Sequence, residues 1–334
     1  MTGPTVLVTD HPWPSTAPEE EILSAVGARL VFAATGEESE LAELAAGADA
    51  ILTCFSQVGA PVVRAAERLQ VIGRYGIGVD NIAVDVATSR GILVTNTPSY
   101  CTDEVAEHTL ALMLALGRRV VAFDRAVRSG DWSLAAGQPV HRLRGQTLGI
   151  IGLGEIGAAV ARRATALGLE VIAYHPRRPA ADLRAAGVEP VSLADLARRA
   201  DFVSVHVPLT DATERLIDAD FLAAMKPTAC LINTARGAVV DQDALVGALR
   251  EDRIAGAAVD VVVGERLPAD HPLLELPNAI VTPHVAYYSE ESLLDLGRLA
   301  AENVAAVLAG TRPPSIVNPQ VLALERWSHL APEA

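Results

Sequence analysis

The sequence contains two series of short β-rich runs, each alternating with amphipathic helical segments. In the first series the predicted strands cover residues 5–10, 29–33, 49–54, 70–76 and 91–96. In the second series they cover residues 147–154, 170–176, 202–208, 229–235, 256–262 and 278–284. Because strands that alternate with helices form parallel β-α-β units, the pattern predicts two α/β domains, each built on a doubly wound parallel sheet. Two long helical segments, 100–132 and 290–310, are predicted to cross between the domains.

The bulk composition limits the classes of function. Half of the 334 residues are hydrophobic and a fifth are charged, which is enough for two aliphatic cores. The net charge of −14 argues against binding to nucleic acid or anionic membranes, since phosphate binding needs a basic face. Cys54, Cys101 and Cys230 lie far apart, without metal-ligand spacing. We find neither a signal-peptide pattern nor an apolar run of about 20 residues. We therefore expect a cytoplasmic protein with reduced thiols, no metal and no membrane segment.

A glycine-rich turn follows the first strand of the second series. Gly152, Gly154 and Gly157 form a G-x-G-x-x-G pattern directly after an apolar strand and before a helix. Gly152 permits a tight turn, Gly154 lets the backbone approach a pyrophosphate, and Gly157 permits close helix–strand packing. The pattern predicts a dinucleotide site in which the helix N-terminus faces the phosphates. A plain β-α turn is the alternative.

The end of the next strand indicates which dinucleotide binds. An acid at this position usually accepts hydrogen bonds from the ribose hydroxyls, but this chain has His175 there, followed by Arg177 and Arg178. Forked guanidinium donors suit a 2′-phosphate, and His175 does not repel one. We therefore predict an NAD(P)H-dependent protein that favours NADPH over NADH. The alternative is that both arginines are solvated turn residues that point away from the cofactor.

Charged side chains follow the last three strands of the second series. Arg236 follows the strand at 229–235, Asp260 and Glu265 follow the next one, and His284 ends the last. The carboxyl ends of parallel strands meet at one edge of a sheet, so these groups should lie close together. An imidazolium can donate a proton to a carbonyl oxygen, and a neighbouring carboxylate keeps it protonated. A guanidinium can bind a carboxylate and polarise the adjacent carbonyl. The set predicts carbonyl reduction.

Six segments make the pattern more specific: "GRYGIGVDNI", "GIIGLGEIG", "HVPLT", "INTARGAVVDQDAL", "GAAVDVVVGE" and "TPHVAYYSEES". Together they resemble the D-isomer-specific 2-hydroxyacid dehydrogenase family over nearly the whole chain. The resemblance implies reversible reduction of a small 2-oxo acid to a D-2-hydroxy acid. It also implies that Arg236 binds the substrate carboxylate and carbonyl, and that Glu265 pairs with His284, the acid–base residue.

The family fold implies a particular domain organisation. A flavodoxin-like substrate-binding domain is discontinuous and comprises residues 1–99 and 289–334, and a Rossmann nucleotide domain, residues 100–288, is inserted in it. In this family the long crossing helices usually form a dimer interface, so the resemblance implies a homodimer through residues 103–119, "DEVAEHTLALMLALGRR", and their neighbours. A chain of 334 residues is not expected to hold the C-terminal regulatory domains of long phosphoglycerate dehydrogenases.

Individual contacts are also implied by the resemblance. Asp260 seats the nicotinamide amide, and the backbone N–H groups of Gly76 and Ile77 meet the substrate carboxylate. The implied cofactor contacts are Gly152, Gly154, Glu155, Ile156, Gly157, His175, Arg177, Arg178, Val207, Pro208, Thr213, Thr234, Ala235 and Asp260. The implied substrate contacts are Arg74, Tyr75, Gly76, Ile77, Tyr100 and Tyr287.

The segments "NTPSYCTDEVAEHTLAL" and "TPHVAYYSEES" most resemble the branch of the C-terminal-binding-protein corepressors and their bacterial relatives. That branch often has Trp at the position of Tyr287, and the family's usual ribose-binding Asp is His175 here. These departures leave the substrate and the cofactor preference open. A second interpretation is an NAD(H)-sensing binding protein that docks partner peptides without metabolic turnover. The intact set of Arg236, Glu265 and His284 favours the enzyme.

Several other residues have two open interpretations. Residues 11–14, "HPWP", and 54–57, "CFSQ", either edge the substrate site or form strand-to-helix turns. Arg74 either binds a second anionic group of the substrate, such as a phosphate or phosphonate, or pairs with an aspartate. Neither His206 nor His108 is predicted to be the acid. We expect His206 near the cofactor ribose and His108 on a buried helix face.

Overall fold

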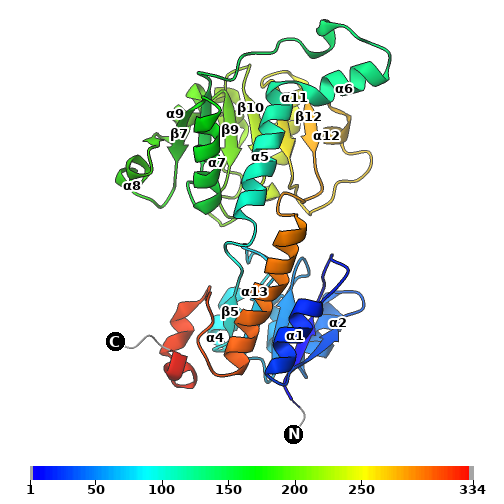
Figure 1. Ribbon diagram of the computed structural model, residues 1–334, viewed down its shortest axis with the longest axis vertical. Helices are drawn as coiled ribbons and strands as arrows, with labels where there is room; N and C mark the ends of the chain where they lie inside the picture. The colour runs from blue at the N-terminus through cyan, green and yellow to red at the C-terminus, as the bar shows by residue number, and fades with distance from the viewer. Residues whose placement is uncertain (1–2, 331–334) are drawn as a thin grey trace. The chain divides into compact units, whose positions relative to one another are not determined.

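The computed structural model describes residues 3–330. The chain forms two compact units. The first contains the residues up to Tyr100 together with those from Ser289 onward, and the second is Cys101–Tyr288. The first unit is therefore discontinuous in sequence, and the second is inserted in it. Figure 1 shows the element order by colour.

The sheet of the first unit has five parallel strands. Their bounds are β1 (Thr5–Val8), β2 (Arg29–Phe32), β3 (Ala50–Thr53), β4 (Val71–Arg74) and β5 (Leu93–Thr95). The order across the sheet is β2-β1-β3-β4-β5, and every pairing is parallel. This is the order of flavodoxin-like sheets.

Helices cover both faces of this sheet. Successive strand residues point to opposite faces, so Val6 and Val8 belong to one core and Leu7 to another. Helices α1 (Ala17–Ala25) and α13 (Glu290–Leu308) pack side by side on the Val6 face (Figure 1). The opposite face is covered by α2 (Glu38–Ala45), α3 (Ala60–Ala65) and α4 (Val84–Ser89). Two short 3-10 helices, η3 (Pro319–Ala323) and η4 (Glu325–Leu330), complete the unit.

The second unit has a seven-stranded parallel sheet. Its strands are β6 (Thr147–Ile151), β7 (Glu170–Tyr174), β8 (Glu189–Pro190), β9 (Phe202–Val205), β10 (Cys230–Asn233), β11 (Gly256–Val259) and β12 (Ala279–Val281). Their order is β12-β11-β10-β9-β6-β7-β8. The strand order reverses between β6 and β9, which is where dinucleotides bind in sheets of this type. Strand β8 has only two residues and lies at the sheet edge.

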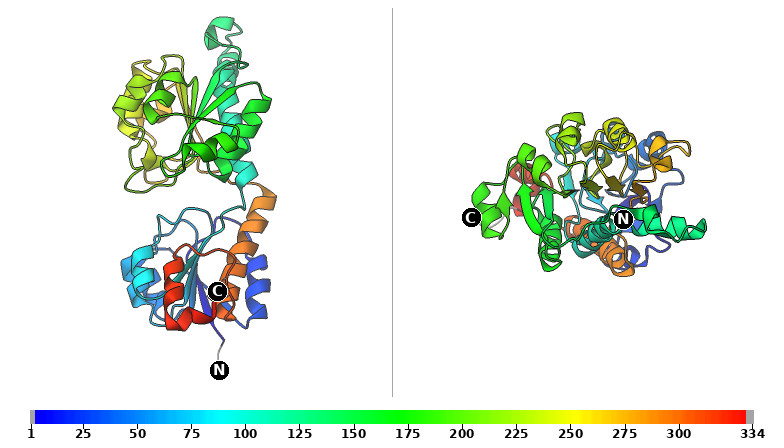
Figure 2. Two further views of the ribbon diagram at one scale, coloured as in Figure 1. Left: turned by 90° about the vertical axis from the view of Figure 1, so that its left-hand side faces the viewer. Right: turned by 90° about the horizontal axis from the view of Figure 1, so that it is seen from above.

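Two aliphatic cores enclose this second sheet. Helices α5 (Thr102–Gly117), α7 (Glu155–Ala166) and α8 (Ala180–Ala185) pack on one face. The other face is covered by α9 (Leu193–Arg199), α10 (Ala219–Ala224), α11 (Gln242–Arg250) and α12 (Pro272–Glu275). Figure 2 shows helices on both sides of each sheet. The prediction of two parallel-sheet α/β domains is confirmed.

The long helical segment predicted at 100–132 is wrong in one respect, because it forms two helices. Helix α5 ends at Gly117, and α6 (Val120–Arg128) begins after Arg119, whose φ is +54°. A left-handed residue cannot continue an α-helix, so the chain changes direction there. Helix α6 and the following 3-10 turn, η1 (Leu134–Gly137), extend away from the sheet (Figure 1). Within residues 3–330, no helix is both long enough and apolar enough to span a membrane.

Candidate active site

The glycine turn after β6 has the geometry of an anion-binding turn. Gly152 has φ +100°, and a Cβ there would lie 2.6 Å from the carbonyl oxygen of His206. At Gly157 a Cβ would lie 2.2 Å from the carbonyl oxygen of Gly152. These two glycines are thus required by packing. Nothing lies within 4 Å of a Cβ built at Gly154, so its missing side chain leaves space for a ligand. Helix α7 starts at Glu155 without a side-chain cap, which leaves backbone donors at its N-terminus.

The turn after β7 brings one arginine back to the glycine turn. His175 Nδ1 accepts the backbone N–H groups of Arg177 and Arg178, each at 3.1 Å. Burial, with help from the two arginines, lowers the pKa of His175, which keeps the ring neutral as this acceptor role requires. Arg178 Nη1 donates to the carbonyl oxygen of Leu153 at 2.6 Å. The Arg178 guanidinium therefore lies against the glycine turn, and both Arg177 and Arg178 are exposed.

The loop after β9 borders the same turn. Val207 is buried, and its Cγ1 would lie 2.9 Å from a Cβ at Gly152, so Val207 packs directly on the turn. Thr213 Oγ1 donates to the carbonyl oxygen of Pro208 at 2.6 Å and accepts the N–H of Thr210 at 2.9 Å. The hydroxyl of Thr213 thus closes the loop that starts at Pro208. These residues therefore form the loop that borders the glycine turn at the carboxyl end of β9.

Arg236 is held by a compact turn after β10. Asn233 Nδ2 donates to the carbonyl oxygen of Arg236 at 2.9 Å, and Asn233 Oδ1 accepts the N–H of Ala235 at 3.0 Å. Thr234 Oγ1 lies 2.9 Å from Thr109 Oγ1 on α5. Because the Thr109 hydroxyl donates its proton to the carbonyl oxygen of Val105, Thr234 must be the donor in this pair. Both the strand end and α5 therefore fix the backbone that carries Arg236.

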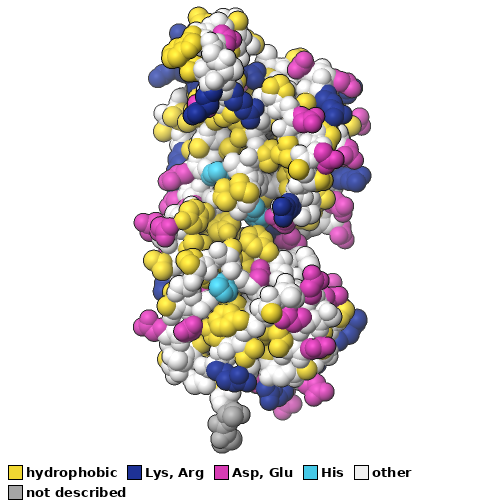
Figure 3. Space-filling model, turned by 90° about the vertical axis from the view of Figure 1, so that its right-hand side faces the viewer, with side chains coloured by type: hydrophobic (Ala, Val, Ile, Leu, Met, Phe, Trp, Pro, Cys, Tyr) yellow, Lys and Arg dark blue, Asp and Glu magenta, His cyan; other side chains and the backbone are white. Residues whose placement is uncertain are grey.

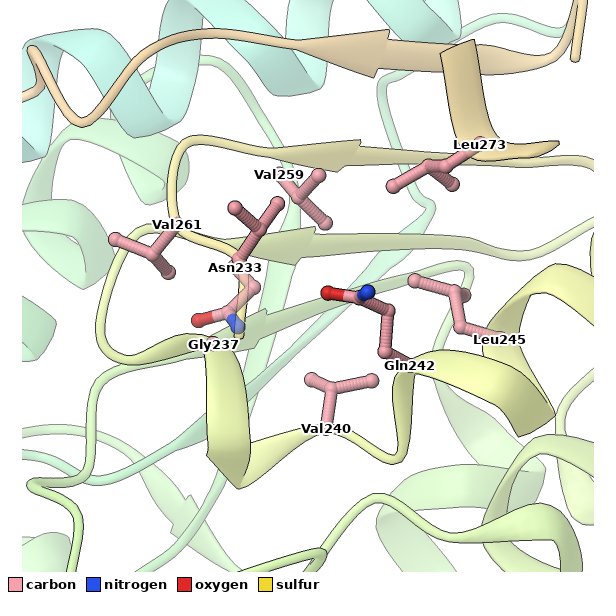
Figure 4. Close-up of a pocket in the computed structure, with 9 residues that line it drawn as sticks. Asn233, Gly237, Val240, Gln242, Leu245, Val259, Val261 and Leu273 are labelled. Carbon is pink, nitrogen blue, oxygen red and sulfur yellow. The ribbon is translucent and has the colours of Figure 1, made fainter. Parts of the chain in front are cut away.

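A small cavity lies under this turn (Figure 4). Its lining is mainly aliphatic and consists of Asn233, Gly237, Val240, Gln242, Leu245, Val259, Val261, Val262 and Leu273. The Gln242 side chain extends into it, and Gln242 Oε1 accepts the N–H of Val263 at 3.0 Å. This bond links the start of α11 to the segment that precedes Glu265.

Asp260 organises the loop that carries His284. Its carboxylate accepts the Thr282 hydroxyl at 2.5 Å and the N–H groups of Val285 at 3.0 Å and Ala286 at 2.8 Å. The carbonyl oxygen of Asp260 accepts the N–H of His284 at 2.8 Å. Asp260 is 1% exposed. Both carboxylate oxygens are thus used by the 282–286 loop, a role that the sequence did not indicate.

His284 and Glu265 form a close pair. His284 Nδ1 lies 2.5 Å from Glu265 Oε2, and both residues have positive φ, +54° and +62° respectively. Such backbone conformations are costly for residues other than glycine and occur where a structure holds functional groups in place. The bond at Nδ1 orients the imidazole of His284 against Glu265. The Tyr287 ring stands edge-on to the imidazole, with centroids 6.1 Å apart.

His206 and His108, two further histidines of this unit, differ in their surroundings. Burial lowers the pKa of His206 to about 4, so the ring is neutral and cannot serve as an acid near neutral pH. His206 Nε2 lies 2.8 Å from Ser204 Oγ. His108 is half-buried rather than on a fully buried helix face, and its Nε2 lies 3.2 Å from Thr282 Oγ1. His108 and Thr109 on α5 therefore each touch one of the two loops that carry Arg236 and His284.

In the first unit, the 74–77 segment follows β4. Arg74 is 7% exposed, and its Nη1 donates to the carbonyl oxygen of Tyr75. Tyr75 as a whole is 1% exposed, so its ring packs in the core and is not accessible to a substrate. The N–H of Gly76 donates to Thr97 Oγ1 at 2.9 Å and to the carbonyl oxygen of Arg74 at 3.0 Å. Ile77 is therefore the better candidate for the anion-binding N–H. Tyr100 packs, partly buried, against the core of this unit.

The segments 11–14 and 54–57 also lie in the first unit. Asp10 accepts the N–H groups of Cys54 at 2.9 Å and Phe55 at 2.6 Å, so 54–57 is a capped turn. The Trp13 ring is 6% exposed and stands edge-on to the Tyr75 ring, with centroids 4.8 Å apart. The two segments thus pack around the strand ends that precede the 74–77 segment.

Comparison with known proteins agrees with this geometry. Residues 110–286 match the model of the D-isomer-specific 2-hydroxyacid dehydrogenase NAD-binding domain. The chain belongs to that family. The glyoxylate reductase of Korarchaeum cryptofilum is 44% identical over 281 residues, which cover 82% of this chain and 84% of that one. The D-3-phosphoglycerate dehydrogenase of Methanocaldococcus jannaschii is 40% identical over 330 residues, which cover 98% of this chain and 62% of that one.

A solved structure of the family is similar over almost the full length. It is the NADPH-dependent glyoxylate/hydroxypyruvate reductase of Sinorhizobium meliloti in complex with NADP and malonate. The TM-score is 0.83 and the identity is 30%, with 99% of each chain covered. The chain is thus an NAD(P)-dependent D-2-hydroxyacid dehydrogenase that uses a nicotinamide cofactor.

Proposed function

We propose that this dehydrogenase reduces a small 2-oxo acid to a D-2-hydroxy acid, reversibly, and that it favours NADPH over NADH. The observation that carries the proposal is the 2.5 Å contact between His284 Nδ1 and Glu265 Oε2. It lies at the carboxyl edge of the second sheet, and the turn that carries Arg236 follows β10 at the same edge. An imidazole oriented by a carboxylate beside a guanidinium suits an oxyanion that must be bound and protonated. Glyoxylate, hydroxypyruvate, branched 2-oxo acids and phospho- or phosphono-oxo acids all fit this chemistry.

His284 supplies the proton in this proposal. Glu265 accepts a hydrogen bond from Nδ1, which orients the ring, and Nε2 gives its proton to the carbonyl oxygen of the substrate. The bound nicotinamide supplies the hydride. In the reverse direction neutral His284 accepts the proton of the hydroxyl group. The Asp260 carboxylate keeps His284 in its strained conformation by holding the 282–286 loop.

Arg236 and the 74–77 segment bind the substrate anion in this proposal. A guanidinium can form two parallel hydrogen bonds with a carboxylate and can polarise the carbonyl next to it. In the first unit, the N–H of Ile77 is a backbone donor for the same kind of group. The buried Arg74 guanidinium packs against the Gly76 backbone, where a Cβ would lie 3.0 Å from Nη1. It therefore adds positive charge at the segment.

The residues present fit a dinucleotide phosphate. The space at Gly154 and the uncapped start of α7 suit the pyrophosphate. Arg178, beside Leu153, and the exposed Arg177 suit a 2′-phosphate, while Val207, Pro208, Thr213, Thr234 and Ala235 line the same sheet edge. Both carboxylate oxygens of Asp260 already accept hydrogen bonds from the 282–286 loop. A hydrogen bond from the nicotinamide amide to Asp260 would have to share one of these oxygens.

We also propose a homodimer that covers α6 and the turn after it. No residue of α6 is buried, and Val120, Trp132 and Leu134 are 56%, 82% and 75% exposed. Figure 3 shows hydrophobic side chains on the part of the surface formed by this arm. Exposed apolar groups that gather on one projection are typical of an interface with another chain.

The activity is tested with NADPH or NADH and a panel of 2-oxo acids. We expect cofactor oxidation with at least one of them. His284→Ala should lower turnover on the order of 10²–10⁴-fold while cofactor binding is kept, because only proton transfer is lost. Near-normal turnover of that variant would contradict the assignment. No oxidation with any 2-oxo acid, together with tight NADH binding, would favour the NAD(H)-sensing binding protein.

A further inference from the structure

A buried carboxyl group lies in the core of the first unit, outside the residues assigned above. Glu19 is on α1 and is 0% exposed, and neither of its carboxyl oxygens has a hydrogen-bond partner among the described residues. The same is true of the hydroxyl oxygen of Tyr75. Buried polar groups are nearly always paired, because an unpaired one costs free energy. A carboxyl group in such a place therefore calls for a functional explanation.

The position of Glu19 does not follow from helix capping. A glutamate three residues after the N-cap Thr16 could accept the N–H of the cap residue, but neither oxygen does so. Its carboxyl instead lies against Gly297 of α13, where a Cβ would approach the carboxyl atoms to 3.0–3.1 Å. Only glycine leaves this space free. The sequence thus places the carboxyl in a gap between α1 and α13.

The groups around the carboxyl lead to the 74–77 segment. The Trp13 and Tyr75 side chains face Glu19, and they are in edge-on contact with each other. Tyr75 directly precedes Gly76 and Ile77 in the chain. The Tyr75 N–H donates to the carbonyl oxygen of Thr53 at 2.8 Å, which ties the segment to the end of β3. The residue whose ring faces Glu19 is thus directly continuous with the backbone that we assign to the substrate carboxylate.

We propose that Glu19 is a positioning residue whose carboxyl, held between Gly297 and the Tyr75 ring, sets the conformation of the 74–77 segment. The inference rests on the proposed function only in assigning that segment to the substrate carboxylate. Burial raises the pKa of Glu19, and its own backbone, Tyr75, Trp13 and His11 oppose the rise. His11 and Tyr75 are thus the titratable groups that affect the pKa of Glu19. From α13, the residue that faces the carboxyl is Gly297, which carries no charge.

Two variants disturb the carboxyl in different ways. Glu19→Gln replaces the acid by an isosteric amide, and Gly297→Ala pushes a methyl group against the intact acid. Alanine favours a helix more than glycine does, so Gly297→Ala should fold. We expect both to raise the KM for the 2-oxo acid on the order of tenfold with kcat nearly unchanged, since a binding segment is displaced and the acid–base pair is not. The exposed Glu21→Gln on the same helix is the control.

Trp13 gives a readout that does not need turnover. Its emission in the protein without ligands should titrate above pH 4.5, the ordinary value for Glu19, and this change should be absent in Glu19→Gln. Trp13→Phe identifies the signal among the three tryptophans. If the protein turns over no 2-oxo acid, KM cannot be measured. The dissociation constant of oxalate, followed by the Trp13 emission, is then compared between the variants instead. Weaker oxalate binding by both variants supports the proposal. An unchanged KM, or unchanged oxalate affinity, in Glu19→Gln and Gly297→Ala overturns it.

Discussion

At the scale of single residues, the contact between Glu265 and His284 should matter for turnover. Glu265 Oε2 lies 2.5 Å from His284 Nδ1, and Glu265→Gln replaces this charge-assisted hydrogen bond by a weaker neutral one. We expect kcat/KM for the 2-oxo acid to fall on the order of tenfold, because the imidazole is held less firmly. Glu214→Gln, an exposed glutamate of the same unit, should leave kcat/KM unchanged. A Glu265→Gln variant with the kcat/KM of the wild type would count against the pairing.

We expect the two arginines after His175 to set the cofactor preference. Hydrogen bonds to charged groups contribute roughly 1.5–3 kcal/mol each. This turn is exposed and salt-screened, so we expect a preference for NADPH on the order of only tenfold. Replacing both arginines with Ala should raise the KM for NADPH and spare that for NADH. Arg178→Ala should have the larger effect, because Arg178 lies against Leu153.

Two further variants sharpen this test. His175→Asp adds an acceptor for the ribose hydroxyls and repels the 2′-phosphate, so it should shift the preference toward NADH. Arg162→Ala, an exposed arginine of α7, is the control. Equal kinetic constants for both cofactors in the wild type, unaffected by the loss of Arg177 and Arg178, would mean that the turn does not discriminate.

At this scale the sequence predicted one contact that the structure contains, the pair of Glu265 and His284. Arg236, Glu265 and His284 follow strand ends, and the structure pairs the last two. Sequence reasoning missed Glu19, because "PEEE" at the start of a helix is typical of solvated first-turn acids. Whether such a residue turns inward depends on Gly297, almost 280 residues away in the chain, and no local pattern contains that information.

At the scale of elements, α5 supports both loops of the site. Thr109→Val removes the hydroxyl that accepts the Thr234 proton and leaves that buried donor unpaired. We expect the free energy of unfolding to fall by about 1–3 kcal/mol. The kcat/KM should also fall, because the turn that carries Arg236 loosens. Thr165→Val on α7, whose hydroxyl also donates one turn back, to Ala161, is exposed and should change neither. Unchanged stability and kcat/KM in Thr109→Val would refute this role of α5.

The strands could be predicted well because their signal is local. Runs such as Val6 to Val8 are short, apolar and bounded by turn residues, and the structure has a strand at each predicted run. The break between α5 and α6 was not predicted, since Val120 and Val127 continue an apolar pattern across it. The left-handed conformation of Arg119 causes the break, and arginine carries no signal for that conformation. The short elements α8 and β8 were also missed.

At the scale of the whole molecule, the exposed arm formed by α6 and η1 should decide the oligomeric state. Trp132 is 82% exposed and Leu134 is 75% exposed, although the other large apolar side chains of this unit are mostly buried. Burying such side chains against a second chain removes apolar surface from water, which stabilises a dimer. We expect the wild type to sediment as a dimer at micromolar concentration. Trp132→Glu combined with Leu134→Glu should shift it to a monomer, because two charges would then face the partner.

The control is Leu294→Glu on α13, where an exposed leucine lies outside the arm. A wild type that sediments as a monomer, or a dimer that survives both charges, would show that the arm is not the interface.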